Sequence, residues 1–302
     1  MLCFYHGGDL DGRCSGAIVK YYNPDCTLIP FDHGRNFPYD KIKGQIVYLC
    51  DMSLHTIEEM RRIEDESAEF IWLDHHAVII EESEKHNFNP TGIRRNGTAA
   101  CELTWEFEAE KHKQPDTPAK AMPQAVKLLG RYDVWDLDFH EDVFPFQVAM
   151  KAKGMDPRYQ MDLWTKFFDL DGDLLIPSTV NQGKAIHEYM KTENTSFMNR
   201  YSINTELDGL KVLAVNRQPV NSAFFESHWD NEKYDLMLGF CRCHNSRDGD
   251  LWKISMFTDK PGVNVGQLAK KYGDYYGFGG GGHVQAAGFV VPGGLENLPF
   301  EV

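Results

Sequence analysis

The sequence predicts a two-domain α/β protein whose first domain contains a mostly parallel β-sheet. Its 302 residues reach the limit of one hydrophobic core, because single cores rarely grow past about 250–300 residues. In residues 1–80 short apolar runs alternate with helical patterns, which is typical of strands joined by right-handed helical crossovers. After residue 201 the pattern becomes strand-rich again, which indicates a second, smaller α/β domain.

Short apolar or β-branched runs predict the strands of the first domain, and apolar positions spaced three or four apart predict its helices. Ser53 is expected to be the N-cap of the helix after the third strand. The expected strands are residues 2–5, 27–31, 45–50 and 70–73, and the expected helices include residues 14–22, 98–113, 119–131, 143–152 and 159–168.

The second half of the chain begins with one long predicted helix, residues 180–200, entered through Pro177 and Ser178. Strands are then expected at residues 211–215, 234–241 and 252–258, followed by a short helix with Val265 and Leu268 on its apolar face. We therefore expect a first domain at residues 1–176, a helical linker at 177–200 and a second domain at 201–302.

The composition excludes several classes of protein. Lys and Arg number 31 against 45 Asp and Glu, a net charge of −14, which disfavours binding of long DNA or RNA but leaves short nucleotides open. Seven scattered cysteines predict reduced thiols, and with no apolar run of about 18–20 residues and no secretory signal we expect a cytoplasmic protein that does not enter membranes.

Acidic and histidine side chains follow three of the predicted strands. Ligands of open α/β sheets bind outside the carboxyl ends of the strands, so these side chains are expected to meet at one edge. The set is His6, Asp9, Asp11, Asp51, His75 and His76, and Asp74 directly precedes the last two.

Several carboxylates held close together repel one another unless a cation neutralises them. Carboxylates with one imidazole per ion suit a divalent metal such as Mn²⁺ better than zinc. Six candidate ligands are too many for one ion that keeps positions open for substrate. We therefore expect two ions about 3.5–4 Å apart, the arrangement that activates water and stabilises phosphoryl oxygens in phosphoester hydrolysis.

A glycine run at residues 279–282, followed by His283, is the second candidate site. Glycines let backbone N–H groups approach a phosphate closely, and His283 can add a side-chain donor. If the following VQAAG segment begins a helix, its N-terminus would face the same anion.

The motifs HGGDLDG, LDHH and GGGGHVQAAG, with Asp51 between the first two, occur in this order from residue 6 to residue 288. Together they resemble the DHH phosphoesterase superfamily, specifically members with a C-terminal DHH-associated domain that contains a GGGH motif. The resemblance implies a metal-binding catalytic DHH domain, a helical linker, and a substrate-binding DHH-associated domain, with the active site in the cleft between the domains. It also implies two Mn²⁺ ions, with Mg²⁺ or Co²⁺ as alternatives.

The resemblance assigns a role to each candidate residue. One ion would be held by His6 and Asp9 and the other by Asp11 and His75, with Asp51 bridging both. His76 would face the scissile phosphate, and Asp74 would orient the histidines. The family needs one further aspartate, for which Asp133 is chosen over Asp136. Substrate would be held by Gly280, Gly281, Gly282 and His283.

The second domain departs from the family at one position. Many relatives have an arginine in the strand that corresponds to KISMFT, where Phe257 or Thr258 stands. Arg242, Arg247 and Lys260 are the alternative phosphate-binding cations, although each is also expected as a surface charge. The aromatic-rich residues 135–146 are expected to pack between helices, with base stacking as the alternative.

These observations predict a Mn²⁺-dependent phosphoesterase that trims short single-stranded oligonucleotides to mononucleotides, as nanoRNase-like family members do. Alternatives within the family are a cyclic-dinucleotide phosphodiesterase and a 3′-phosphoadenosine-5′-phosphate phosphatase, and the non-enzyme alternative is a nucleotide-binding sensor. A homodimer is common among relatives.

Overall fold

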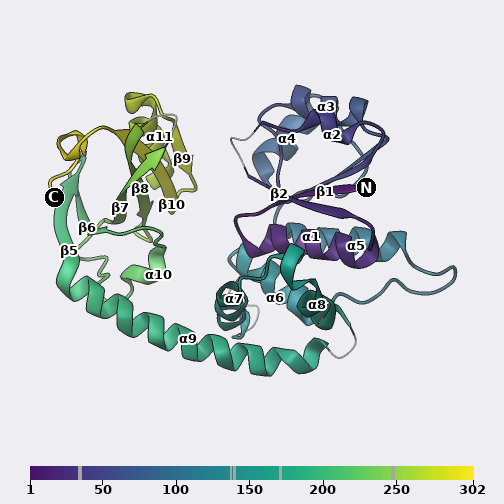
Figure 1. Ribbon diagram of the computed structural model, residues 1–302. Coiled ribbons are helices and arrows are strands. Elements are labelled where there is room, and N and C mark those ends of the chain that lie inside the picture. The colour runs from purple at the N-terminus through teal and green to yellow at the C-terminus, as the bar shows by residue number, and fades with distance from the viewer. Residues whose placement is uncertain (33–35, 137, 139–140, 170–171, 246–248) are drawn as a thin grey trace. The chain divides into compact units, whose positions relative to one another are not determined.

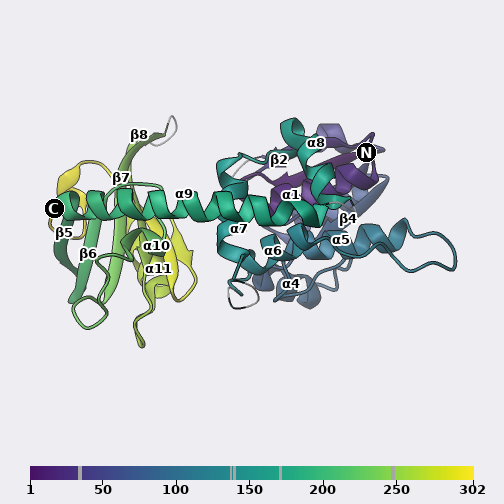
Figure 2. The ribbon, with the colours of Figure 1, turned by 90° about the horizontal axis from the view of Figure 1, so that it is seen from below.

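The computed structural model describes residues 1–32, 36–136, 138, 141–169, 172–245 and 249–302. The chain divides into two compact units, Met1–His187 and Glu188–Val302. Helix α9 (Gly172–Tyr201) crosses the boundary between them as one continuous helix (Figure 2). It begins before Pro177, so this proline lies inside the helix and not at its entrance as predicted.

The first unit is built on a four-stranded parallel sheet. Its strands are β1 (Leu2–His6), β2 (Thr27–Phe31), β3 (Ile46–Cys50) and β4 (Glu69–Leu73), in the order β2-β1-β3-β4. The predicted α/β class and parallel sheet are therefore confirmed. Because β1 pairs with a strand on each side, its register is fixed, and its last residue, His6, is held at the sheet's carboxyl edge.

Helices cover both faces of this sheet (Figure 1). Helices α1 (Leu10–Tyr22) and α5 (Ala100–Lys111) lie on one face, and α2 (Tyr39–Ile42), α3 (Ile57–Glu66) and α4 (Ala77–Lys85) lie on the other. Successive residues of a strand point to opposite faces, so Cys3 and Tyr5 join one apolar cluster and Phe4 joins the other. This double coverage explains why the strands read as continuous apolar runs.

A helical layer completes the first unit on the α1 side. Helices α6 (Gln124–Asp133), α7 (Val143–Ala152) and α8 (Pro157–Phe168) pack with α1 and α5 around a core that includes Trp105, Phe146 and Trp164. The predicted helices of this region are confirmed, with small differences at their ends. This layer also positions Asp133, one of the candidate ligands, at the end of α6.

The predicted cap of α3 was wrong. Thr56, not Ser53, is the N-cap, and it forms a capping box in which the Glu59 N–H donates to Thr56 Oγ1 (3.2 Å) and the Thr56 N–H donates to Glu59 Oε2 (3.3 Å). A Thr-x-x-Glu cap satisfies two helix-end donors, which Ser53 followed by Thr56 cannot do.

The second unit contains a six-stranded mixed sheet in the order β5-β6-β7-β8-β10-β9. Its strands are β5 (Ser202–Leu207), β6 (Leu210–Asn216), β7 (Leu236–Asn245), β8 (Gly249–Phe257), β9 (Gly280–Gly282) and β10 (Ala286–Pro292). Helix α11 (Val265–Tyr276) packs on one face, and α10 (Ser222–Phe225) with the end of α9 packs on the other. A short 3-10 helix, Leu295–Asn297, follows.

The expectation of a helix beginning in VQAAG was wrong. Ala286 opens β10, which pairs with β8 through Phe289 and Ile254 and with the glycine strand β9. The β-branched and aromatic residues that follow favour a strand, so the phosphate-facing helix N-terminus does not exist at this place.

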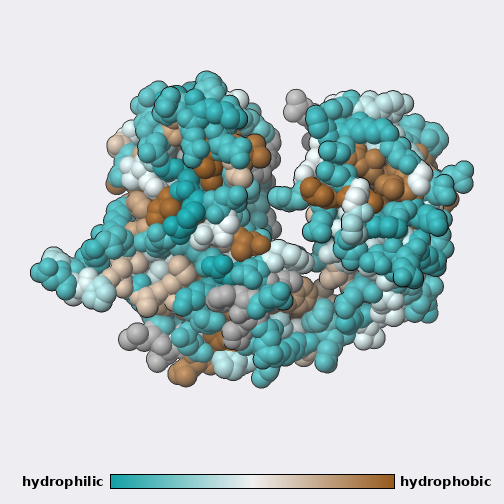
Figure 3. Space-filling view, turned by 180° about the vertical axis from the view of Figure 1, so that it is seen from behind, coloured by the Kyte–Doolittle hydropathy of each residue, from teal (hydrophilic) through white to brown (hydrophobic). Residues whose placement is uncertain are grey.

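The surface agrees with the charged composition. The face drawn in Figure 3 is mostly hydrophilic, with separate hydrophobic patches on each unit. In the described part of the chain, no helix is long and apolar enough to cross a bilayer. All seven cysteines are free, as predicted.

The corrected cap gives a matched pair of substitutions. Thr56→Ala removes the capping box and should lower the free energy of unfolding of the first unit by about 0.5–2 kcal/mol, whereas Ser53→Ala should change it by less than about 0.5 kcal/mol. Urea denaturation followed by circular dichroism measures both. An equal loss in the two variants would contradict the assignment of Thr56 as the cap.

Candidate metal centre

Parallel strands bring the predicted residues to one edge of the sheet. His6 is the last residue of β1, Asp51 follows β3, and Asp74 follows β4. The Asp51 N–H donates to the Leu73 carbonyl (2.9 Å), which ties the ends of β3 and β4 together. Asp51 adopts a left-handed backbone conformation, with φ of 58°, which costs free energy for any residue other than glycine but is tolerated best by Asp and Asn.

Helix α1 delivers two further carboxylates. Asp9 is its N-cap and accepts a hydrogen bond from the Gly12 N–H (3.0 Å), and Asp11 lies in the first turn. Gly12 is required here because a Cβ at this position would lie 2.2 Å from the His6 carbonyl oxygen. The missing side chain thus lets the start of α1 lie directly against the end of β1.

The first group of potential ligands is His6, Asp9 and Asp51, whose ligand atoms all lie within 4.8 Å of one another. His6 Nδ1 is 2.8 Å from Asp9 Oδ2 and 3.5 Å from Asp51 Oδ2. His6 ends β1, Asp9 is the N-cap of α1, and Asp51 follows β3. The secondary structure therefore fixes the backbone of all three residues.

The second group is Asp11, His75 and Asp133. His75 Nε2 lies 3.3 Å from Asp133 Oδ2 and 3.7 Å from Asp11 Oδ2. Asp136, the alternative to Asp133 in the sequence, instead lies 3.6 Å from the Arg131 guanidinium. The structure therefore brings Asp133 into the cluster and not Asp136.

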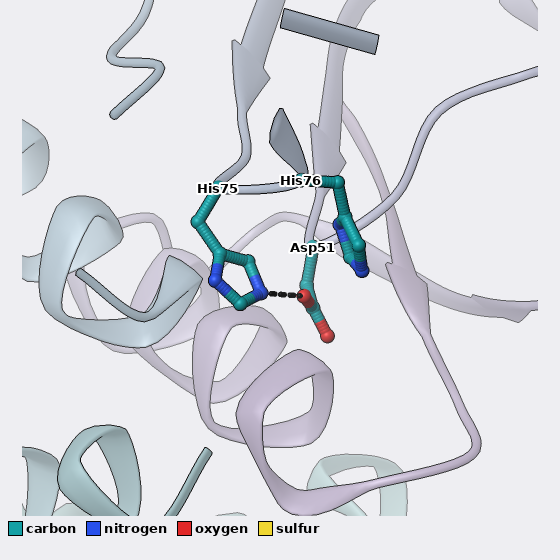
Figure 4. A group of neighbouring side chains, drawn as sticks. All are labelled: Asp51, His75 and His76. Carbon is teal, nitrogen blue, oxygen red and sulfur yellow. Dashed lines mark ion pairs between the residues drawn. The ribbon is translucent and has the colours of Figure 1, made fainter. Parts of the chain in front are cut away.

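Asp51 lies between the two groups. Its Oδ2 faces His6, and its Oδ1 is 3.4 Å from His75 Nε2. Figure 4 shows His75 and His76 on either side of the Asp51 carboxylate, and the three residues form a further group of potential ligands. A carboxylate whose two oxygens face different imidazoles has the geometry needed to contact two ions at once.

Asp74 fixes the orientation of His76. Its Oδ1 accepts from His76 Nδ1 (2.7 Å) and from the backbone N–H groups of His75 (2.8 Å) and His76 (3.3 Å). The Trp72 indole N–H donates to Asp74 Oδ2 (3.2 Å), so both oxygens of the buried carboxylate are held in place. Asp74 thus contacts the ring of His76, while its hydrogen bond to His75 is to the backbone.

The electrostatics of the cluster fit a cation. Burial raises the pKa of Asp11, Asp51 and Asp133, and the neighbouring carboxylates raise it further. Hydrogen bonds to Asp51 and Asp9 raise the pKa of His6 to about 10. Burial acts to raise the pKa of Asp9, but the contacts with His6 and the Gly12 N–H outweigh it and the pKa is lowered. A cation at this place would favour the ionised carboxylates that burial disfavours.

Two further interactions position the second group, and neither was predicted from the sequence. The oxygens of Asp11 accept from the backbone N–H groups of Ala100 (2.9 Å) and Cys101 (2.7 Å) at the start of α5. Glu102, only 4% exposed, pairs with Arg131 of α6 at 3.0 Å. The helices that hold Asp11 and Asp133 are thereby joined next to the ligands.

Asp32 and Arg13 were also missed. Asp32 directly follows β2, and its Oδ1 is 4.0 Å from His6 Nε2. Its position after an apolar strand is the same signal that identified Asp51, so the sequence could have revealed it. Arg13 donates to the carbonyls of Gly7 (3.0 Å) and Gly154 (3.1 Å), which braces the loop between His6 and Asp9.

The predicted substrate-binding residues lie together in the second unit. Gly280, Gly281 and Gly282 form the edge strand β9, and the His283 N–H donates to the Ala286 carbonyl (2.8 Å). Close packing requires glycine at two of these positions. A Cβ at Gly280 would lie 2.3 Å from the Ala269 carbonyl oxygen, and a Cβ at Gly282 would lie 2.5 Å from the Ala286 carbonyl oxygen. Gly281 is exposed and a Cβ there would meet no atom within 4 Å.

The alternative cations of the second unit are engaged elsewhere. Arg242 pairs with Asp250 and Lys260 pairs with Asp235. Arg247 lies outside the described residues. Thr258 is buried, and its hydroxyl donates to the Asp235 carbonyl (2.8 Å). Thr258, one of the two residues expected at the arginine position of many relatives, therefore has a structural hydrogen bond beside the Lys260–Asp235 pair.

Two solved structures have a fold similar to that of this chain. The DHH domain of a member of a family of ribosomal proteins matches with a TM-score of 0.56 at 11% identity, covering 95% of this chain and 81% of that chain. RecJ from Thermus thermophilus, solved in complex with Mn²⁺, matches with a TM-score of 0.52 at 12% identity, covering 95% of this chain and 49% of RecJ. The chain therefore shares the fold of this DHH domain and of RecJ over nearly its full length, and it has a His/Asp cluster that could hold metal ions.

Comparison by sequence finds a viral relative but no matching family model. No protein-family model matches the chain. The uncharacterized protein R106 of Acanthamoeba polyphaga mimivirus is 24% identical over 322 residues, covering 98% of this chain and 69% of that protein. The fold that the motifs predicted is therefore confirmed by the structural similarity to a DHH domain and to RecJ.

The cluster predicts how Mn²⁺ binds. The pKa values of Asp11, Asp51, Asp133 and His6 are raised, so each group holds its proton more tightly than it would in water, and an entering cation should release protons. Calorimetric titration of Mn²⁺ in two buffers of different ionisation enthalpy should give different apparent enthalpies. Asp133→Asn should weaken binding by about tenfold or more.

Asp136→Asn is the matched control, since this residue is in the same segment but outside the cluster. It should leave the Mn²⁺ affinity within about twofold, a change of less than about 0.5 kcal/mol. Equal affinities of the two variants, or equal enthalpies in the two buffers, would contradict the second group of ligands.

Proposed function

We propose that the protein is a two-metal phosphoesterase that hydrolyses short oligonucleotides to mononucleotides. The observation on which this depends is the position of Asp51, whose two carboxylate oxygens face His6 and His75 in separate groups. One carboxylate between two sets of ligands is the arrangement that phosphoester hydrolysis by two ions requires.

The donors fit Mn²⁺, with Mg²⁺ or Co²⁺ as alternatives. His6 and Asp9 would hold one ion, Asp11, His75 and Asp133 the other, and Asp51 would contact both. When bound, the ions would supply an activated water and neutralise charge on the phosphoryl oxygens. The Mn²⁺ complex of RecJ makes this ion the first one to test.

His76 is proposed to contact the reacting phosphate. The bond from Nδ1 to Asp74 (2.7 Å) leaves Nε2 as the outward nitrogen, and the side chain is 51% exposed. The hydrogen bond to Asp74 raises the pKa of His76 to about 9, so Nε2 carries a proton near neutral pH. It can therefore donate to a phosphate oxygen or to the leaving oxygen. Asp74 acts on this reaction through His76, as a positioning residue.

The substrate class is inferred from charge and from the second unit. A net charge of −14 disfavours long nucleic acids, whose binding depends on many cationic contacts. The exposed Gly281 and His283 are proposed to bind a phosphate or sugar of the substrate by backbone and side-chain donors. This favours substrates of a few nucleotides.

Loss of His76 tests its role. His76→Ala should lower kcat by about 10²–10⁴-fold while Mn²⁺ binding changes by no more than a few-fold, because His76 is not assigned to either ion. His86→Ala is the control, since His86 is a surface histidine paired with Glu82 (3.0 Å), and its kcat should equal that of the unmodified protein. Hydrolysis assays with calorimetric Mn²⁺ titration measure both quantities. Full activity of His76→Ala would refute its contact with the phosphate.

A substrate panel tests the function as a whole. With Mn²⁺, a dinucleotide and a five-mer should yield mononucleotides, a twenty-four-mer should react more slowly, and EDTA should abolish all turnover. Asp51→Ala should be inactive but folded by circular dichroism, because the carboxylate shared by the two groups is lost. Cleavage by this variant would contradict the bridging assignment.

The same panel separates the alternatives. Hydrolysis of cyclic di-AMP alone would identify a cyclic-dinucleotide phosphodiesterase, and hydrolysis of 3′-phosphoadenosine-5′-phosphate alone would identify a phosphatase of that compound. The panel also includes pyrophosphate. If the protein binds nucleotides but hydrolyses none of these compounds, it is a nucleotide-binding sensor and the proposed enzymatic function is wrong.

A further inference from the structure

Trp135 occupies a backbone position that normally belongs to glycine. Helix α6 ends at Asp133, with Val134 as its C-cap. The Trp135 N–H donates to the Tyr132 carbonyl (3.1 Å), and the Asp136 N–H donates to the Arg131 carbonyl (2.8 Å). These two bonds define a Schellman motif, in which the residue after the C-cap is left-handed and is usually glycine. Here that residue is a tryptophan with φ of 58°.

Among the described residues, Trp135 is exceptional in this respect. The other non-glycine residues with positive φ are Asp51, Asn87, Asp116 and Asp208. Asp and Asn tolerate the left-handed region because their short polar side chains bond locally, whereas a bulky residue there is a true outlier. Such outliers are typical of functional sites, where another requirement outweighs the strain.

The indole is exposed, and it belongs to the segment that directly follows Asp133 of the second ligand group. Trp135 is 57% exposed, although burial of so large an apolar side chain would be favourable. It follows Asp133 by two residues, so their Cα atoms lie at most about 7.6 Å apart. The Tyr132 ring braces it edge-on at a centroid distance of 5.6 Å, and Tyr132 in turn packs on Phe144 at 6.0 Å.

We propose that Trp135 stacks on a nucleobase of the substrate whose phosphate lies at the metal centre. This inference rests on the proposed function and adds how the base is recognised. Indole–base stacking accepts every base, because each has a π-face. It also requires no cationic side chain, which suits a chain with a net charge of −14. The ions would thus hold the phosphate and Trp135 the base attached to it.

A purely structural role makes the opposite prediction for Trp135→Gly. Glycine is the preferred residue at this position, so this variant should unfold at an equal or higher temperature than the unmodified protein. If Trp135 served only to end α6, Trp135→Gly would keep full function. If Trp135 stacks on a base, Trp135→Gly combines unimpaired stability with weakened nucleotide binding, and Trp135→Phe retains part of the binding.

The experiment compares ligands with and without a base. Calorimetry with Mn²⁺ present measures the affinity of AMP and of ribose 5-phosphate, which differ only in the base. The unmodified protein should bind AMP about tenfold or more tightly than ribose 5-phosphate. In Trp135→Gly the two affinities should become equal, with that for ribose 5-phosphate unchanged. Tyr159→Ala, which removes another exposed aromatic ring of the first unit (79% exposed), should retain the preference for AMP.

This design separates the inference from the proposed hydrolysis. A preference for AMP that survives in Trp135→Gly, or no preference in the unmodified protein, would overturn the stacking role whether or not oligonucleotides are cleaved. A preference lost in Trp135→Gly would support stacking even if the substrate panel showed no turnover. Where turnover occurs, KM for a dinucleotide should rise about tenfold or more in Trp135→Gly, while an abasic dinucleotide should react equally with both proteins.

Discussion

Mutual repulsion among buried carboxylates is the constraint around which the first unit is organised. Asp11, Asp51 and Asp74 are each nearly inaccessible to water, and an isolated ionised carboxylate in such a place is strongly disfavoured. The sheet keeps them there because they occupy the ends of strands and the first turn of a helix, which the core fixes. The imidazoles of His6 and His75 lie between the carboxylates, and a bound cation would offset the remaining repulsion.

The parallel sheet and the cluster were predictable because both depend on local sequence signals. Continuous apolar strands indicated a sheet buried on both faces, and Asp51 and His75 were found by their position at strand ends. The preference for Asp133 over Asp136 came from the family resemblance, and the geometry agrees with it. The metal assignment itself stays a prediction, since it concerns ions and not the chain.

Other features could not be predicted, for physical reasons. Glu102 and Arg131 join two helices although they are 29 residues apart in sequence, and no local pattern indicates such a contact. Ser53 and Thr56 are both suitable caps, and only the Glu59 side chain decides between them. The strand after the glycine run was missed because its formation depends on pairing with β8. For the segment that contains Trp135 the sequence left both helix packing and base stacking open, and only the left-handed backbone and the exposed indole favour the proposed stacking.

Asp11 shows how one side chain can be subject to two separate selections. Its two oxygens anchor the first turn of α5 and also face the second ligand group. Glutamate or histidine could still donate to a metal, yet histidine has a single acceptor nitrogen and the longer glutamate side chain would have to displace its carboxylate from the two amides. A mutational path at this position is therefore closed even to replacements that preserve the ligand chemistry. The two amide bonds alone give a reason for aspartate at this position, one that does not depend on whether an ion is bound.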